Sequence, residues 1–72
     1  MDIQRLITMA NQIGDFYESY PNKSHAQKDI ADHLNKFWAL PMRKQIAQYV
    51  GEQGGAGLHQ HVQIAIKNHM QV

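Results

Sequence analysis

Cysteine is absent from the 72 residues, so no disulfide can stabilise the fold and no thiol can act as a nucleophile. This absence fits a reducing compartment. Long apolar runs are absent too: the first residues, MDIQRLITMANQIGDF, carry Asp2, Arg5 and Asp15. That pattern excludes a signal peptide or a transmembrane span in this segment. We therefore expect a soluble, cytoplasmic protein with no membrane partner.

The chain also lacks a dominant charge and strand-forming residues. Seven basic and six acidic residues give a net charge of +1, which predicts no nucleic-acid partner. There are only two prolines and few β-branched residues, which argues against a sheet. Without repeats or linkers, residues 1–72 are expected to form a single helical domain. A domain of this size buries only about 60% of the surface of its unfolded chain, so it is marginal unless well packed or partnered.

Apolar residues at helical spacing predict an all-α fold, a small bundle of about four short helices. The first should span residues 3–19, with Asp2 as its cap. Met9, Phe16 and Tyr20 widen its apolar arc beyond the stripe that a surface helix needs. We expect these three side chains to bind a partner. Gly14 within the helix is explained equally well by a close helix crossing and by simple tolerance of glycine.

Three further helices follow from capping and breaking signals. The second should begin at Ser24, which forms a capping box with Gln27, and should stop near Ala39, just before Leu40-Pro41. The third should start at Pro41 and fade at Gly51, and the fourth should start near Leu58. The glycine-rich GEQGGAGL between them has neither the preceding strand nor the following Lys-Ser/Thr of a phosphate loop. It is therefore expected to be a helix connection.

The adjacent rings of Phe37 and Trp38 cannot face the same way on a helix, because successive residues are about 100° apart. Phe37 shares a face with Ile30 and Leu34, so we expect it in the core and Trp38 on the rim, as a partner anchor. Arg43 has two interpretations. Its stem could simply pack on the surface, or its guanidinium could reach a partner's carboxylate or carbonyl groups.

Candidate catalytic and metal-binding groups are weak. His25 and His33 are eight residues apart on a predicted helix, roughly 12 Å along its axis, which is too far for one metal ion. His59 and His61 would diverge on a helix. The two serines lie near helix ends and suggest no catalytic triad. We expect no catalytic, cofactor-binding or metal-binding residue.

Four segments, in this order and at this chain length, resemble the delta subunit of the soluble NAD-dependent molybdenum formate dehydrogenases: LITMANQIGDFY, IADHLNKFW, PMRKQI and GGAGL. The resemblance spans nearly the whole chain. Its most specific parts are M-A-N-Q-I followed by an aromatic pair, and H-L-x-x-F-W followed by M-R. The chain departs from the family pattern at Ala39-Leu40-Pro41, where the proline is shifted by one residue.

The resemblance implies a non-catalytic accessory subunit without a cofactor of its own. Its partner would be the large subunit of formate dehydrogenase, which contains molybdenum and iron-sulfur centres, and its role would be to support assembly or stability of that subunit. The expected partner-binding residues are Trp38, Arg43, Met9, Phe16 and Tyr20. The isolated chain is expected to self-associate or to expose apolar surface.

Two alternatives remain open at the level of sequence. One is a small helix-turn-helix-like DNA-binding module, in which PMRKQIAQYV would be the recognition helix and would present Arg43 and Lys44. The sequence pI of about 8.1 is low for such a module. The other is a carrier that binds a metal through its histidines.

Overall fold

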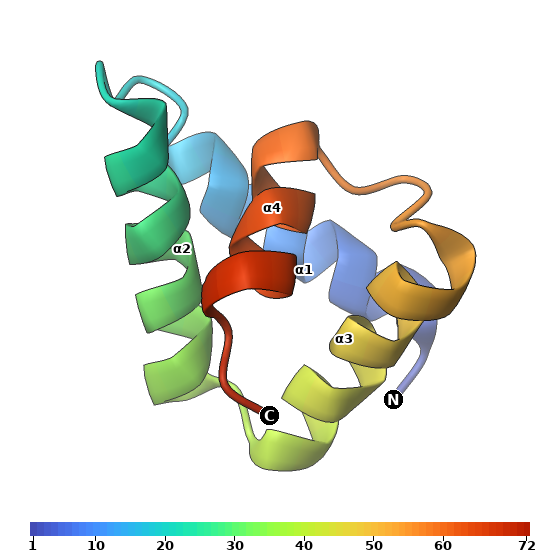
Figure 1. Ribbon diagram of the computed structural model, residues 1–72. Coiled ribbons are helices and arrows are strands. Elements are labelled where there is room, and N and C mark those ends of the chain that lie inside the picture. The colour runs from blue at the N-terminus through green and yellow to red at the C-terminus, as the bar shows by residue number, and fades with distance from the viewer.

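The computed structural model describes residues 1–72 and contains four helices and no strand. The helices are α1 Ile3–Phe16, α2 Lys23–Phe37, α3 Leu40–Gln53 and α4 Gln60–His69. The predicted all-α bundle is therefore confirmed. Figure 1 shows α4 between α2 and α3, with α1 behind them. None of the helices is both long and apolar enough to span a membrane.

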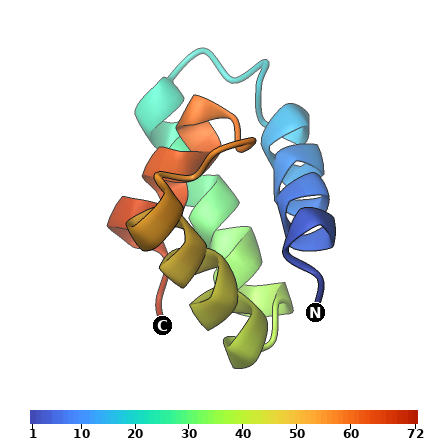
Figure 2. The same cartoon turned by 90° about the vertical axis from the view of Figure 1, so that its right-hand side faces the viewer.

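Helix α4 is the central element, because it packs against all three other helices and most extensively against α2. In Figure 2, α1 stands on one side of the molecule and the other three helices are grouped on the other side. The core contains side chains from every helix, and no polar or charged residue is buried. Its members are Leu6, Ile7, Ala10, Ile30, Ala31, Leu34, Trp38, Ile46, Leu58, Val62, Ala65 and Ile66.

The beginnings of the helices follow local capping rules, with one change from the prediction. The side chain of Asp2 accepts a hydrogen bond from the backbone nitrogen of Gln4 at 3.1 Å, so the predicted cap of α1 is confirmed. Helix α2 is capped by Asn22, not by Ser24. The Asn22 side chain accepts from the backbone nitrogen of His25 at 3.0 Å. Asparagine caps at least as well as serine, so the earlier residue takes the position.

The junction between α2 and α3 lies earlier in the chain than predicted and consists of two extended residues. Helix α2 ends at Phe37, two residues before the expected stop, and Trp38 has extended backbone angles (φ −87°, ψ 133°). Ala39 is extended as well (φ −60°, ψ 149°), and Pro41 becomes the second residue of α3 instead of the first. Proline suits either place, because its missing N–H has no partner in the first turn of a helix.

The early end of α2 reverses the predicted roles of its two aromatic rings. Trp38 is only 6% exposed and belongs to the core, whereas Phe37 is 72% exposed. The 100° rule does not apply to Trp38, because that residue has left the helix and its extended backbone carries the indole inward. Phe37 stays on the apolar side of α2, but a surface hollow and not a packed helix lies over that end. The assignment of Phe37 to the core was therefore wrong.

Gly14 marks a close approach of α1 to α4. A Cβ atom built on Gly14 would lie 2.4 Å from Cγ2 of Val62, closer than real Cβ contacts allow. The carbonyl oxygen of Gly14 also lies 3.2 Å from Nε2 of His61, within hydrogen-bonding distance. Of the two explanations for this glycine, the close helix crossing is therefore the one that the structure supports.

We predict that Gly14→Ala lowers the free energy of unfolding by about 1–3 kcal/mol, because the added methyl group overpacks the contact with Val62. Gly51→Ala is the matched control. Gly51 also lies within a helix, but a Cβ there would meet nothing within 4 Å. This control should be neutral or stabilising by about 0.5–1 kcal/mol. Urea unfolding followed by circular dichroism measures both, and equal effects of the two substitutions would contradict the crossing.

We also predict that Trp38→Ala destabilises the chain by about 3–5 kcal/mol, because it leaves a cavity in the core. This loss approaches the whole stability of a small domain. Phe37→Ala should change the free energy of unfolding by no more than about 0.5 kcal/mol, because the ring is mostly in solvent. Thermal unfolding of the two variants compares them directly. The reverse order of stability would show that Phe37 is the core ring after all.

Candidate partner-binding groove

An apolar groove of about 440 Å³ opens on the surface between α1 and the end of α2. Most of its lining is hydrophobic, and it has no carboxylate or lysine in its wall. Its lining residues are Met9, Gln12, Ile13, Phe16, Tyr17, His33, Phe37 and Trp38. We call this feature the α1–α2 groove. It exists because α1 is held against α4 at Gly14 and makes little direct contact with α2.

Two exposed phenylalanine rings flank the groove. Phe16, the last residue of α1, is 74% exposed, and Phe37, the last residue of α2, is 72% exposed. Each ring has one aromatic neighbour: Phe16 meets Tyr17 edge-on with 5.1 Å between ring centroids, and Phe37 meets His33 at 4.8 Å. These contacts orient the rings without burying them. Large apolar side chains that remain in water at the edge of a concave surface are typical of interaction sites.

The structure brings together three of the five side chains that the sequence suggested for partner binding. Met9, Phe16 and Trp38 all line the α1–α2 groove, with Trp38 almost fully covered. Tyr20 is not in the lining, but its ring packs edge-on against that of Tyr17 at 5.1 Å, so it lies next to the groove. Sequence reasoning missed Phe37 as a surface residue. The available signal was its place beside Trp38, since only one of the two rings could be buried.

Arg43, the fifth of these residues, is engaged within the chain. Its Nη1 atom donates to the carbonyl oxygen of Asn35 at 2.7 Å and to that of Trp38 at 3.1 Å. The carbonyl of Asn35 lies in the last turn of α2 and that of Trp38 just past its end, where no further helical N–H is available to them. Arg43 therefore fastens the end of α2 to the first turn of α3. This arrangement differs from both interpretations drawn from the sequence. The guanidinium neither rests free on the surface nor points away from the chain, because Nη1 binds two carbonyl groups of the same chain.

An acidic shelf, which we define as Asp29 and Asp32, lies beside the α1–α2 groove. Both residues line a smaller hollow of about 190 Å³ together with Lys36 and with Tyr17, His33 and Phe37, which also belong to the groove. The only ion pair in the chain joins His59 to Asp15, so neither carboxylate of the shelf has a charged partner. The pKa of Tyr17 is raised, first by burial and then by the charges of Tyr20, Asp29 and Asp32.

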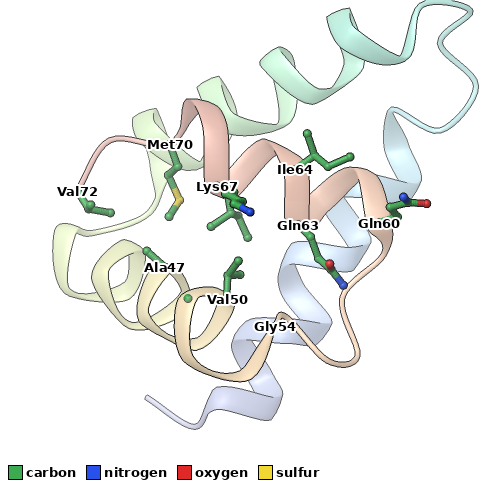
Figure 3. A pocket seen from close by; sticks show the side chains of 11 residues that line it. Ala47, Val50, Gly54, Gln60, Gln63, Ile64, Lys67, Met70 and Val72 are labelled. Carbon is green, nitrogen blue, oxygen red and sulfur yellow. The ribbon is translucent and has the colours of Figure 1, made fainter.

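A second hollow, of about 510 Å³, lies between α3 and α4. Figure 3 shows Lys67 of α4 and Met70, just past the end of that helix, facing Ala47 and Val50 of α3 across it. Unlike the α1–α2 groove it has no exposed aromatic ring, and its only large exposed apolar side chain is that of Val72. It is therefore the weaker candidate for a partner-binding site.

The histidines are arranged differently from the prediction, but they form no cluster of ligands. His59 lies just before α4, so its ring does not diverge from that of His61; the two stack with 5.9 Å between centroids. Nε2 of His59 pairs with Oδ1 of Asp15 at 3.0 Å. No group of three or more histidine, aspartate or glutamate side chains could hold a metal ion.

The segments MANQIG and GGAGL meet in the structure at Asn11. Its side chain donates to the carbonyl oxygen of Gly57 at 2.9 Å and accepts from the backbone nitrogen of His59 at 2.9 Å. Residues 5–66 match the family described as NADH-dependant formate dehydrogenase delta subunit FdsD. The chain belongs to this family. The match runs from the first turns of α1 into α4 and so includes both segments that Asn11 joins. No curated protein and no solved structure matches the chain.

We predict that the isolated delta subunit binds a hydrophobic dye, or self-associates, through the α1–α2 groove, because Phe16 and Phe37 are exposed there. The double variant Phe16→Ser/Phe37→Ser should lose most of the dye fluorescence and should be monomeric by light scattering. Leu40→Ser is the matched control, because Leu40 is also exposed but lies outside the groove. A monomeric wild-type chain that binds no dye would contradict this prediction.

Proposed function

We propose that this delta subunit is a non-catalytic accessory subunit that binds the molybdenum- and iron-sulfur-containing large subunit of a formate dehydrogenase and supports its assembly or stability. The observation that carries the proposal is the family match over residues 5–66, together with an apolar groove flanked by two exposed rings. A cytoplasmic location goes with it, since the cysteine-free composition fits a reducing compartment.

A non-catalytic role is supported by the chemistry of the groove. Catalytic acids and bases usually lie in pockets where burial or a neighbouring charge shifts their pKa. In this chain no polar or charged residue is buried. The pKa of Tyr17 is raised by burial and by neighbouring charges, which keeps the phenol neutral. Such a surface is suited to contact with another protein and not to proton transfer.

We place the contact with the large subunit at the α1–α2 groove. Met9, Phe16 and Phe37 would supply the apolar contact, with Tyr20 beside them. Trp38 would support this surface from below, because it lies in the groove but is almost fully covered. Protein interfaces concentrate their binding energy in a few aromatic side chains surrounded by a polar rim, and this groove has that composition.

The DNA-binding alternative is less favourable on this geometry. A recognition helix in α3 would need its basic residues directed outward, toward phosphates and base edges. Arg43 instead donates to two carbonyl groups at the end of α2. Lys44 would then be the only cation of the pair available for nucleic acid, which is too few for measurable affinity at physiological salt.

We predict that a host lacking this chain has lower formate dehydrogenase activity, because the large subunit is assembled less completely or is lost faster. The measurement is the molybdenum and iron content, thermal stability and specific activity of the large subunit purified with and without the chain. Affinity capture of the tagged chain from its native host should recover the large subunit. Normal metal content, stability and activity in its absence would count against the proposal.

A further inference from the structure

The acidic shelf of Asp29 and Asp32 indicates which charge a molecule bound in the α1–α2 groove should carry. The two residues are three positions apart on α2, which places their side chains next to one another on the helix surface. Their hollow shares Tyr17, His33 and Phe37 with the groove, so an occupant of the groove would lie alongside both carboxylates. The shelf and the groove therefore form one continuous surface.

The charged side chains that line this hollow give it a net negative charge. Lys36 lines the same hollow, but its nitrogen is not within 4.0 Å of either carboxylate. Asp29, Asp32 and Lys36 together carry one more negative than positive charge. Tyr17 adds none, because its phenol is neutral, and His59 and Asp15 are paired with each other. An occupant that brings a cation to Asp29 and Asp32 would gain an interaction that the chain itself does not supply.

The same charges argue against two other occupants. A second copy bound through a two-fold axis would bring its own two aspartates into the interface with no cation beyond its own Lys36, so self-association offers these carboxylates less than a basic partner would. Like charges in one interface are unfavourable. Nucleic acid is disfavoured because its phosphates would meet the two carboxylates. A basic segment of another protein is the occupant that this surface fits.

The shape of the groove fits a helix. The groove has a volume of about 440 Å³. It is an open trough with few polar groups to orient a small molecule, and one wall comes from α1 and the other from the end of α2. Amphipathic helices bind to apolar troughs of this kind through bulky side chains on one face, with charged residues at the edge.

We propose that the α1–α2 groove and the acidic shelf together receive an amphipathic helix of the large subunit, which seats bulky apolar side chains between Phe16 and Phe37 and directs a lysine or arginine at Asp29 and Asp32. This inference rests on the proposed function, because it takes the large subunit as the partner. It adds the kind of segment that binds and the charge that the segment carries.

The test is the affinity of the full chain for the purified large subunit, measured by calorimetry for wild type, Asp32→Lys and Glu52→Lys. The two variants make the same change in charge on exposed residues, but Glu52 lies on α3, away from the groove. Asp32→Lys should weaken binding by about tenfold or more, since it places a cation opposite the partner's cation. Glu52→Lys should stay within about twofold of wild type. Circular dichroism checks that both variants are folded.

A second variant tests the shelf without introducing repulsion. Asp29→Asn/Asp32→Asn should weaken binding and make it less sensitive to salt, because the charge attraction is removed. A lysine or arginine of the large subunit that cross-links to the shelf, once changed to aspartate, should restore the affinity for Asp32→Lys. Such rescue is not expected if Asp32 acts only through the fold of this chain.

The outcomes separate this inference from the proposed function. A wild-type chain that does not bind the large subunit would overturn both. A wild-type chain that binds, with Asp32→Lys and Glu52→Lys equally tight, would overturn the basic helix and leave the accessory role in place. A third outcome is a complex in which two copies of this chain contact each other through Phe16 and Phe37. A second copy would then occupy the groove, and the proposal of a basic helix would be overturned.

Discussion

The contact between Gly14 of α1 and Val62 of α4 is the constraint on which the arrangement of the helices depends. Because Gly14 has no side chain, the backbone of α1 can lie directly against α4. Helix α4 in turn packs most extensively against α2. Helix α1 is thereby fixed to α4 rather than to α2, and the space left beside the end of α2 is the groove between Phe16 and Phe37. Gly14 therefore helps to set where the α1–α2 groove opens.

A chain without disulfides holds its central helix with two asparagine side chains. At the start of α4, Asn11 of α1 binds the backbone on both sides of Leu58. Beyond the end of α4, Asn35 of α2 accepts from the backbone nitrogen of Gln71 at 2.8 Å and lies 3.4 Å from the carbonyl oxygen of His69. A side-chain amide carries both a donor and an acceptor, so one residue can satisfy two groups at a helix end.

The sequence was sufficient to predict what depends on local pattern. The four helices, the cap at Asp2 and the helix connection through the glycines follow from periodicity and capping chemistry, which act over a few residues. The roles of Phe37 and Trp38 could not be predicted, because they depend on whether α2 ends before or after these residues. A shift of two residues turns the indole inward. The position of Arg43 likewise depends on carbonyls that exist only once α2 has ended and α3 has folded back.

The exposed rings of this chain also bear on its stability. Leaving two phenylalanines in water forgoes the roughly 1.5–3 kcal/mol that burying each would contribute, in a domain whose size already limits its core. A partner that covers Phe16 and Phe37 would recover part of this free energy and would stabilise the fold by mass action, since it binds only the folded chain. The groove would then contribute both to partner binding and to the stability of the folded chain. The chain would then be most stable when bound, and the ring of Phe37 would be available to a partner because Trp38 fills the core in its place.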